Sequence, residues 1–399
     1  MPDLLKKALD IRFFSHISAH IFGIVAPLAI YNLTHSLTYA GISLFLEWAF
    51  KLFTYFYGGV IFSFKNANYL LKTTFYFRVL SLLALIFTLQ GFVPWWIITI
   101  AAIAYQINSA IIYISFEVSI SSWTSCSSSG HTKMIARDNW AGALGIAMGL
   151  IFHSLTILIC IALVFLAISI YMQNKYGIAL FIDRESKKPH ISDFLAPWKS
   201  MKNMSADMWK LGLLCVLYNV PVAVIFPAMP FFMSDAFNTK EISTAFFSTT
   251  NLVRIFICAT VLHLSLSYIK KYTSRVAFEH SLYVSLVCLA AMIFVPSYYF
   301  LAAMIGMGAF TYCMAPWIRE TRQKLITDKS QAHELTGIMN AFTGVGFLIA
   351  GTLTALNFHP KTLIIISFLS LLLSFVVYLR MSYVKKSKHA YIQSQSASS

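Results

Sequence analysis

Glu47, Lys51 and Arg254 lie inside long apolar stretches of this sequence, where a charge needs a specific reason. Glu47 and Lys51 are four residues apart in GISLFLEWAFKLFTYFYGG, and Arg254 lies in the apolar stretch 241–266. A spacing of four places Glu47 and Lys51 on one face of a helix, with the carboxylate on the favourable N-terminal side. Charges at such depth are costly and commonly functional. The alternative interpretation is a structural ion pair that neutralises itself.

An internal repeat relates Lys51 to Arg254. Several residue types recur at one offset of 203 residues, and after a two-residue gap the match continues: Pro27 and Pro230, Lys51 and Arg254, Lys72 and Arg275, Glu117 and Glu320, Asn139 and Asn340, Gly145 and Gly346. Thr250 stands where the second half would match Glu47. Two cations against one anion suit an anionic ligand, because arginine offers a planar fork to a carboxylate and lysine a point charge.

Polar side chains also interrupt the apolar stretches 94–116 and 208–233. Gln106 and Asn108 lie in the first, and Tyr218 and Asn219 lie in the second. Lipid-facing positions tolerate such groups poorly, so together they predict a water-filled path that binds a substrate. Hydrogen bonds between helices are the alternative for any one of them.

Two residues could exchange a proton within the predicted membrane segments. His20 lies one helical turn after His16, and an imidazole can take up a proton near neutral pH. Glu47 is the only carboxylate predicted to lie in the middle of a helix. We therefore expect Glu47 and His20 to serve proton coupling, with hydrogen-bonded packing as the alternative for the histidine.

Charged residues also gather where two apolar segments end. Glu117 and Glu320 follow the segments 94–116 and 297–318, and basic residues that include Arg137 and Arg322 come after them. They predict ion pairs that gate the cytoplasmic side. Solvated helix ends are an equal interpretation.

Composition decides the broad class. The chain has 399 residues, of which 58% are hydrophobic and only 11% charged, which is too apolar for the surface of a soluble fold. The net charge of +15 comes from basic residues in short loops, so nucleic-acid binding is not expected. The six cysteines show no CxxC spacing, and no DxxxD, HExxH or GxSxG motif occurs. We expect no metal site, no cofactor and no enzymatic activity.

A span of about 20 apolar residues crosses a bilayer as a helix. The sequence predicts an all-α membrane protein with twelve such helices in two pseudo-symmetric bundles. The predicted domains are an N-terminal bundle (1–173), a cytoplasmic linker (174–207), a C-terminal bundle (208–384) and a cytoplasmic tail (385–399). The predicted helices are 12–34, 39–62, 70–90, 94–116, 136–153, 155–173, 208–233, 241–266, 277–295, 297–318, 335–357 and 360–383.

Basic residues fix the orientation. One face collects 25 of the 30 lysines and arginines, including the seven in the polar stretch 173–210. By the positive-inside rule this face is cytoplasmic and carries both termini.

Twelve segments in two sets of six, with a long basic central loop, resemble the major facilitator superfamily of secondary transporters over nearly the whole chain. The loop GGVIFSFKNANYLLK (58–72) is similar to the family's glycine-and-basic signature, although Ser63 and Phe64 stand where an acidic and a basic residue are usual. The segments GISLFLEWAFKLFTYFYGG and WIRETRQKLITDKSQAHELTGIMNAFTGVGFLIAG are similar to members associated with siderophore transport.

The resemblance implies an inner-membrane, monomeric transporter that moves a small, anionic, siderophore-like metabolite by alternating access. The coupling ion would be a proton, and lipid would be the other partner. A multidrug exporter is a weaker match, because AIAYQINSAIIY lacks the arginine motif of drug–proton antiporters. Efflux of other metabolites and a non-transporting sensor or scaffold remain the alternatives.

Overall fold

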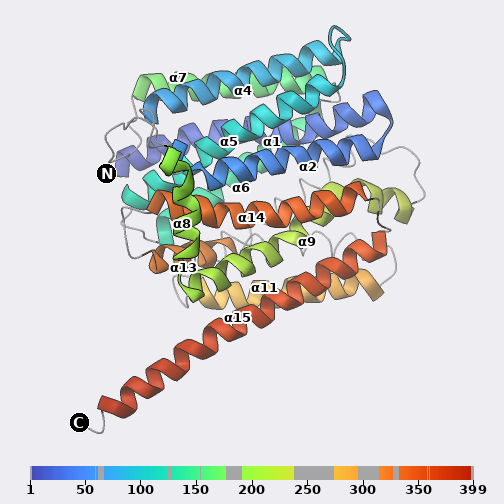
Figure 1. Ribbon diagram of the computed structural model, residues 1–399. Coiled ribbons are helices and arrows are strands. Elements are labelled where there is room, and N and C mark those ends of the chain that lie inside the picture. The colour runs from blue at the N-terminus through green and yellow to red at the C-terminus, as the bar shows by residue number, and fades with distance from the viewer. Residues whose placement is uncertain are drawn as a thin grey trace.

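The computed structural model describes residues 2–58, 60–61, 67–123, 128–152, 154–176, 191–237, 274–294, 314–326, 332–356, 358 and 360–396. In these ranges every long element is an α-helix (Figure 1). The helices before the linker, which we call the N-terminal half, are α1 (Pro2–Thr34), α2 (Leu37–Phe56), α4 (Ala67–Leu89), α5 (Trp96–Trp123), α6 (Ser128–Ile151) and α7 (Leu155–Tyr176).

The linker and the C-terminal half follow. The linker holds a 3-10 turn, η1 (Ile191–Leu195), and the short helix α8 (Ala196–Lys202). The C-terminal half consists of α9 (Ala206–Phe237), α11 (Ser274–Phe294), α13 (Ala315–Leu325), α14 (Ala332–Ala355) and α15 (Pro360–Ser396). The long helices run side by side, whereas α8 lies across them near the end of the bundle where α1 begins (Figure 1). We call this end, which also holds the end of α15, the basic end.

Local sequence signals account for several helix boundaries. The side chain of Ser36 accepts a hydrogen bond from the backbone N–H of Tyr39 and so caps the start of α2. Helices α8 and α13 each begin with a proline in the first turn, where its missing N–H costs no hydrogen bond. Gly91, in the turn between α4 and α5, has a φ of 80°, a conformation that favours glycine.

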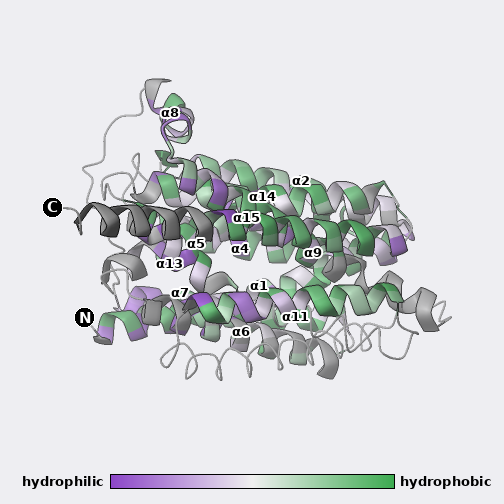
Figure 2. Ribbon diagram, turned by 90° about the horizontal axis from the view of Figure 1, so that it is seen from below, coloured by the Kyte–Doolittle hydropathy of each residue, from purple (hydrophilic) through white to green (hydrophobic). Residues whose placement is uncertain are grey.

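The predicted segments match these helices wherever the structure describes them. Among the described residues, eight helices are long and apolar enough to cross a membrane, and hydrophobic residues follow most of their length (Figure 2). Helices α2 and α6 have 20 and 24 residues and include charged side chains: Glu47 and Lys51 in α2, and Lys133, Arg137 and Asp138 in α6. The predicted segment 241–266 and most of 297–318 lie outside the described residues.

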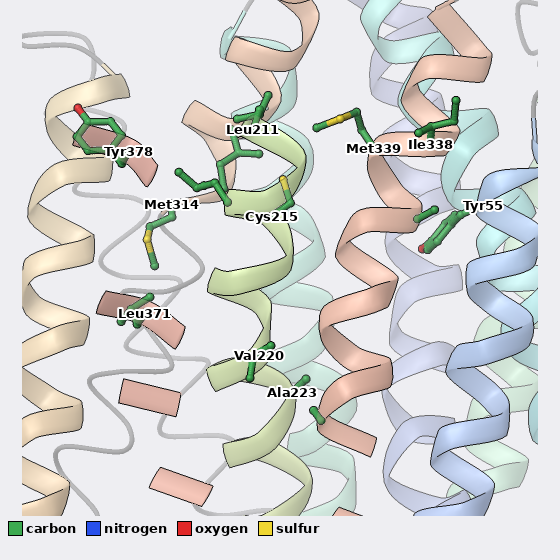
Figure 3. Close-up of a cluster of buried hydrophobic side chains, with 14 of the residues drawn as sticks. Tyr55, Leu211, Cys215, Val220, Ala223, Met314, Ile338, Met339, Leu371 and Tyr378 are labelled. Carbon is green, nitrogen blue, oxygen red and sulfur yellow. The ribbon is translucent and has the colours of Figure 1, made fainter. Parts of the chain in front are cut away.

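Two hydrophobic cores hold the helices together. One core consists of residues from the N-terminal half alone. The other lies mostly in the C-terminal half but includes Tyr55 and Phe56 of α2 and Ile111 and Ile114 of α5. Figure 3 shows Tyr55 between α2 and α14, with Cys215 on the neighbouring α9. Helices α2 and α5 therefore join the two halves through buried apolar contact.

Two glycines of the sequence repeat make matching close approaches in the two halves. A Cβ added to Gly145 of α6 would lie 3.0 Å from the carbonyl oxygen of Ile17 on α1. A Cβ added to Gly346 of α14 would lie 2.7 Å from the carbonyl oxygen of Val216 on α9. The equivalent helices thus pack backbone to backbone in both halves, as small residues allow in membrane bundles.

Candidate functional site

Among the described residues, helices α2 and α14 form the most extensive contact between the two halves. The rings of Trp48 on α2 and Phe347 on α14 stack with their centroids 3.9 Å apart. Gly344 approaches Leu52 and Gly351 approaches Phe45, so the two helices pack antiparallel. This interface brings Lys51, one residue before Leu52, to the boundary between the halves.

Glu47 and Lys51 are joined through a third side chain. The Lys51 ammonium donates to the Gln106 carbonyl oxygen at 3.0 Å, and the Gln106 amide donates to the Glu47 carboxylate at 3.4 Å. Ser43 donates to the other carboxylate oxygen at 3.2 Å, and the Lys51 ammonium lies 4.1 Å from the centre of the Trp48 ring. The sequence predicted the shared face. The structure adds that Gln106 of α5 bridges the charges, in place of a simple pair within α2.

Two buried arginines form a second network inside the N-terminal half. Arg78 of α4 donates to the hydroxyl and carbonyl oxygens of Ser15, at 2.5 and 3.0 Å, and to the Tyr105 hydroxyl. Arg12 of α1 makes two bonds to Asp138 of α6, at 2.9 and 2.8 Å, in the bidentate arrangement that suits arginine and a carboxylate. Both arginine side chains are 1% exposed, so they belong to the bundle interior.

A buried ion pair crosses between the halves at the basic end. Arg322 of α13 donates to Glu117 of α5, and the two side chains are 5% and 0% exposed. Asn340 of α14 completes the set: it accepts from Arg322 at 3.0 Å and donates to Glu117 at 3.1 Å. We call Glu117, Arg322 and Asn340 the latch. Both oxygens of Glu117 are thereby bonded to the C-terminal half.

A cavity of about 90 Å³ lies beside the latch, between the halves. Arg319 of α13 also lines it, and its guanidinium donates to the Tyr113 hydroxyl and lies 5.5 Å from the centre of the Tyr113 ring. Arg12 lies 4.8 Å from the centre of the same ring. The cavity is lined by Tyr55, Tyr113, Cys215, Tyr218, Ile318, Arg319, Arg322, Met339, Asn340 and Thr343.

The predicted substrate-binding residues occupy different environments. Tyr218 lines the cavity and Gln106 belongs to the Glu47–Lys51 network. Asn108 and Asn219 are buried, and each donates to the carbonyl oxygen four residues earlier, at 2.7 and 2.6 Å. These bonds lie within each asparagine's own helix and not between helices, so substrate binding by Asn108 and Asn219 stays a prediction. Arg254 lies outside the described residues.

The predicted gating and proton-coupling residues also occupy different environments. Glu117 and Arg322 form the latch, whereas Arg137 pairs with Asp10 of α1 inside the N-terminal half. Glu320 pairs at 2.6 Å with Lys324 on its own helix. The structure thus does not bring Arg137 or Glu320 to the latch. His20 lies against Gly142 of α6, with its ring 6.1 Å from that of His16.

Sequence reasoning missed Arg12 and Arg319 as interior cations, and it placed Arg78 within a helix without giving it a role. Arg12 and Arg319 were assigned to the cytoplasmic face, because they lie at the ends of apolar segments. A usable signal existed for Arg78, which interrupts an apolar stretch, and for Asp138, an acidic residue at the start of a predicted span.

Comparison with known proteins identifies the fold. No family model matches the sequence, and no curated protein matches it. Solved structures do match. One is a bacterial homologue of the iron transporter ferroportin in an outward-facing state, with a TM-score of 0.72, 14% identity, and 95% of this chain and 99% of that chain covered. Its inward-facing state has a TM-score of 0.66, with 15% identity and 96% and 99% covered.

A second similar structure is the human organic anion transporter MFSD10, with a TM-score of 0.73, 11% identity, and 94% of this chain and 98% of that chain covered. The chain therefore has the fold of major facilitator transporters, as its resemblance to that superfamily implied. Its structural neighbours are transporters, not enzymes, in agreement with the expectation from the missing catalytic motifs.

Proposed function

We propose that this protein is a secondary active transporter that moves a small anionic metabolite across the membrane by alternating access. The observation that carries the proposal is the excess of cations between the two halves of a transporter fold. Lys51, Arg319 and Arg322 lie at or near this boundary, against the two carboxylates Glu47 and Glu117. Buried charge of one sign in a membrane protein commonly marks a path for ligands of the other sign.

The contacts between the halves support a conformational cycle. The latch closes the passage at the basic end, so ligand could leave on that side only if Glu117 and Arg322 separated. The higher TM-score to the outward-facing state of the ferroportin homologue than to its inward-facing state agrees with this closure, if the basic end is cytoplasmic. Rocking of one half against the other would expose the site to each side in turn.

Proton coupling is assigned to the Glu47 network. Glu47 is buried one helical turn before Lys51 on α2, and Gln106 links the two side chains. Protonation of Glu47 would remove its attraction for Gln106 and release the amide to reorient, which would alter the environment of Lys51. His20, which lies on α1 against Gly142, is the second candidate for the proton path.

We place the protein in the bacterial inner membrane with the basic end in the cytoplasm, since basic residues favour the cytoplasmic side. The cargo class that we propose is a carboxylate-bearing, siderophore-like metabolite. The ferroportin homologue is described as an iron transporter, but the described residues hold no group of three histidine, cysteine or acidic side chains that could bind a metal ion.

Flux into proteoliposomes tests the proposal. Vesicles with the purified protein and vesicles without it would receive radiolabelled citrate, ferric citrate or Fe²⁺, each with and without a pH gradient. We expect protein-dependent citrate or ferric citrate flux that responds to the gradient. Flux of Fe²⁺ alone would refute the anionic cargo, and absence of all flux would favour a sensor or scaffold.

A further inference from the structure

We propose that the cavity beside the latch is a binding site for one carboxylate group, held between Arg319 and Arg322. This inference rests on the proposed function only in choosing anions as the ligand class. It assigns the binding to residues at the basic end, where Tyr113 lies about two turns of α5 beyond Gln106.

Unused hydrogen-bond donors carry the inference. The Nη1 of Arg319 and the Nε of Arg322 are buried and have no hydrogen-bond partner among the described residues. Both side chains line the same cavity, and that of Arg322 is 95% buried. Buried donors are rarely left unpaired in a folded protein, so a ligand that accepts their hydrogen bonds is one of the few explanations for such groups. Here two guanidinium groups share one empty space.

The charge of the cavity favours an anion. Glu117 compensates Arg322, but Arg319 has no ion-pair partner in the part of the chain that the structure describes. Its bond to the neutral Tyr113 hydroxyl leaves its charge in place, and Arg12 lies near the same ring. The described lining residues include no carboxylate. One uncompensated positive charge matches one carboxylate.

The lining of the cavity fits a carboxylate with a short aliphatic part. The hydroxyls of Tyr55, Tyr113 and Tyr218 can donate hydrogen bonds to its oxygens, whereas Ile318 and Met339 form apolar walls. The volume of about 90 Å³ far exceeds the roughly 10–15 Å³ that a single water needs by the same measure. Planar guanidinium groups bind carboxylates through paired N–H donors.

The position of Arg322 links binding to closure. An anion in the cavity and Glu117 of the latch both attract the guanidinium of Arg322, so each weakens the hold of the other. By thermodynamic linkage, an occupied cavity favours separation of the latch, and an open latch favours anion binding. Ligand arrival would thus promote opening toward the basic end.

Calorimetric binding of succinate to the purified full-length protein in detergent tests the site. The wild type is compared with Arg319→Gln, Arg319→Lys and Lys324→Gln. Lys324 lies on the same helix but is 72% exposed, so its substitution removes an equal charge away from the cavity. We expect Arg319→Gln to weaken affinity by about 10- to 100-fold, as the loss of a charged hydrogen bond implies. The affinity of Arg319→Lys for succinate should lie between those of the wild type and Arg319→Gln, and the affinity of Lys324→Gln should equal that of the wild type.

Equal affinity of the wild type and Arg319→Gln would overturn the site, as would absence of succinate binding by the wild type. Phosphate is titrated in parallel, because tighter binding of phosphate than of succinate would contradict the carboxylate assignment. Glu117→Gln tests the link to the latch: succinate should bind several-fold more tightly, and weaker binding would refute the competition for Arg322.

Cys215 provides a second measurement that needs no arginine variant. It is a free cysteine that lines the cavity. In the Glu117→Gln protein, whose latch is expected to be open already, and with the other five cysteines replaced by alanine, succinate at ten times its dissociation constant should slow alkylation of Cys215 about tenfold. An unchanged rate would place the succinate elsewhere.

Proteoliposome flux separates this inference from the proposed function. If the wild type transports succinate but its affinity for succinate does not depend on Arg319, the proposed function stands and the proposed site is refuted. If succinate binding depends on Arg319 but no anion is transported, the proposed site stands and the proposed function is refuted.

Discussion

Replacement of Glu117 by glutamine tests whether the latch closes the basic end. Glu117 is fully buried and binds Arg322 and Asn340 of the opposite half. Removing one partner of a buried ion pair costs about 3–5 kcal/mol, because the other charge remains buried without compensation. Glutamine keeps the shape of the side chain and one oxygen acceptor, so we take the lower limit of this cost, about 3 kcal/mol. If the cost applies only to the closed state, about 3 kcal/mol lowers the ratio of closed to open molecules roughly 150-fold.

The assay is alkylation of Cys215 by a membrane-impermeant thiol reagent added from the basic end, in a protein whose other cysteines are replaced by alanine. We expect the Glu117→Gln protein to react at least about tenfold faster than the parent, since opening of the latch exposes the cavity that Cys215 lines. Glu320→Gln is the matched control on α13. Its partner Lys324 is exposed, and exposed ion pairs contribute only about 0–1 kcal/mol.

Charge exchange sharpens the test. Arg322→Glu alone places two carboxylates at the latch and should also open it. The double variant Glu117→Arg with Arg322→Glu should restore slow alkylation, because it re-forms the pair with reversed polarity. An unchanged Cys215 rate in Glu117→Gln would refute the latch, and a double variant as reactive as Glu117→Gln would show that the effect does not come from pairing.

Three further predictions concern coupling, packing and orientation. Glu47→Gln should abolish pH-dependent accumulation of substrate while changing its affinity little, and unaltered pH dependence would leave Glu47 a structural counter-ion. Gly346→Ala should destabilise the protein by about 1–3 kcal/mol in thermal unfolding, because its Cβ would meet the α9 backbone, whereas Gly23→Ala has open space and should not. A cysteine at Phe92 should react with an external impermeant reagent in intact cells, and one at Asn203 only after permeabilisation; the reverse pattern would overturn the orientation.

Helix positions could be predicted from the sequence because they depend on local composition. The uninterrupted apolar stretch 155–173 could be nothing but a membrane helix, and α7 occupies it. The repeat between Gly145 and Gly346 was also visible, since close helix packing requires the same small residue wherever the same backbone approach occurs. Boundaries were less accurate. Helix α6 begins eight residues before the predicted 136, because polar turns at the basic end extend the helix beyond the apolar span.

The chemistry of the interior was predicted only where a charge interrupts an apolar stretch. Glu47 and Lys51 met this condition, and both lie in the described interior network. Arg12 and Arg319 lie at the ends of apolar stretches and do not interrupt them. The sequence pattern at such an end is the same whether the basic side chain faces water or points into the bundle. Asn108 and Asn219 also interrupt apolar stretches, and the side chain of each donates to a carbonyl oxygen of its own helix.

The sequence by itself determined the helical membrane fold, the repeat and the presence of charge within it. Only the tertiary structure decided which charges meet. Glu117 and Arg322 are 205 residues apart and belong to different halves, so no local rule pairs them in preference to Glu117 with Arg137 or Glu320 with Lys324. The packing of α5 against α13 and α14 makes that choice. A buried charge takes whichever partner the helix arrangement brings within reach, because without a partner its desolvation is uncompensated.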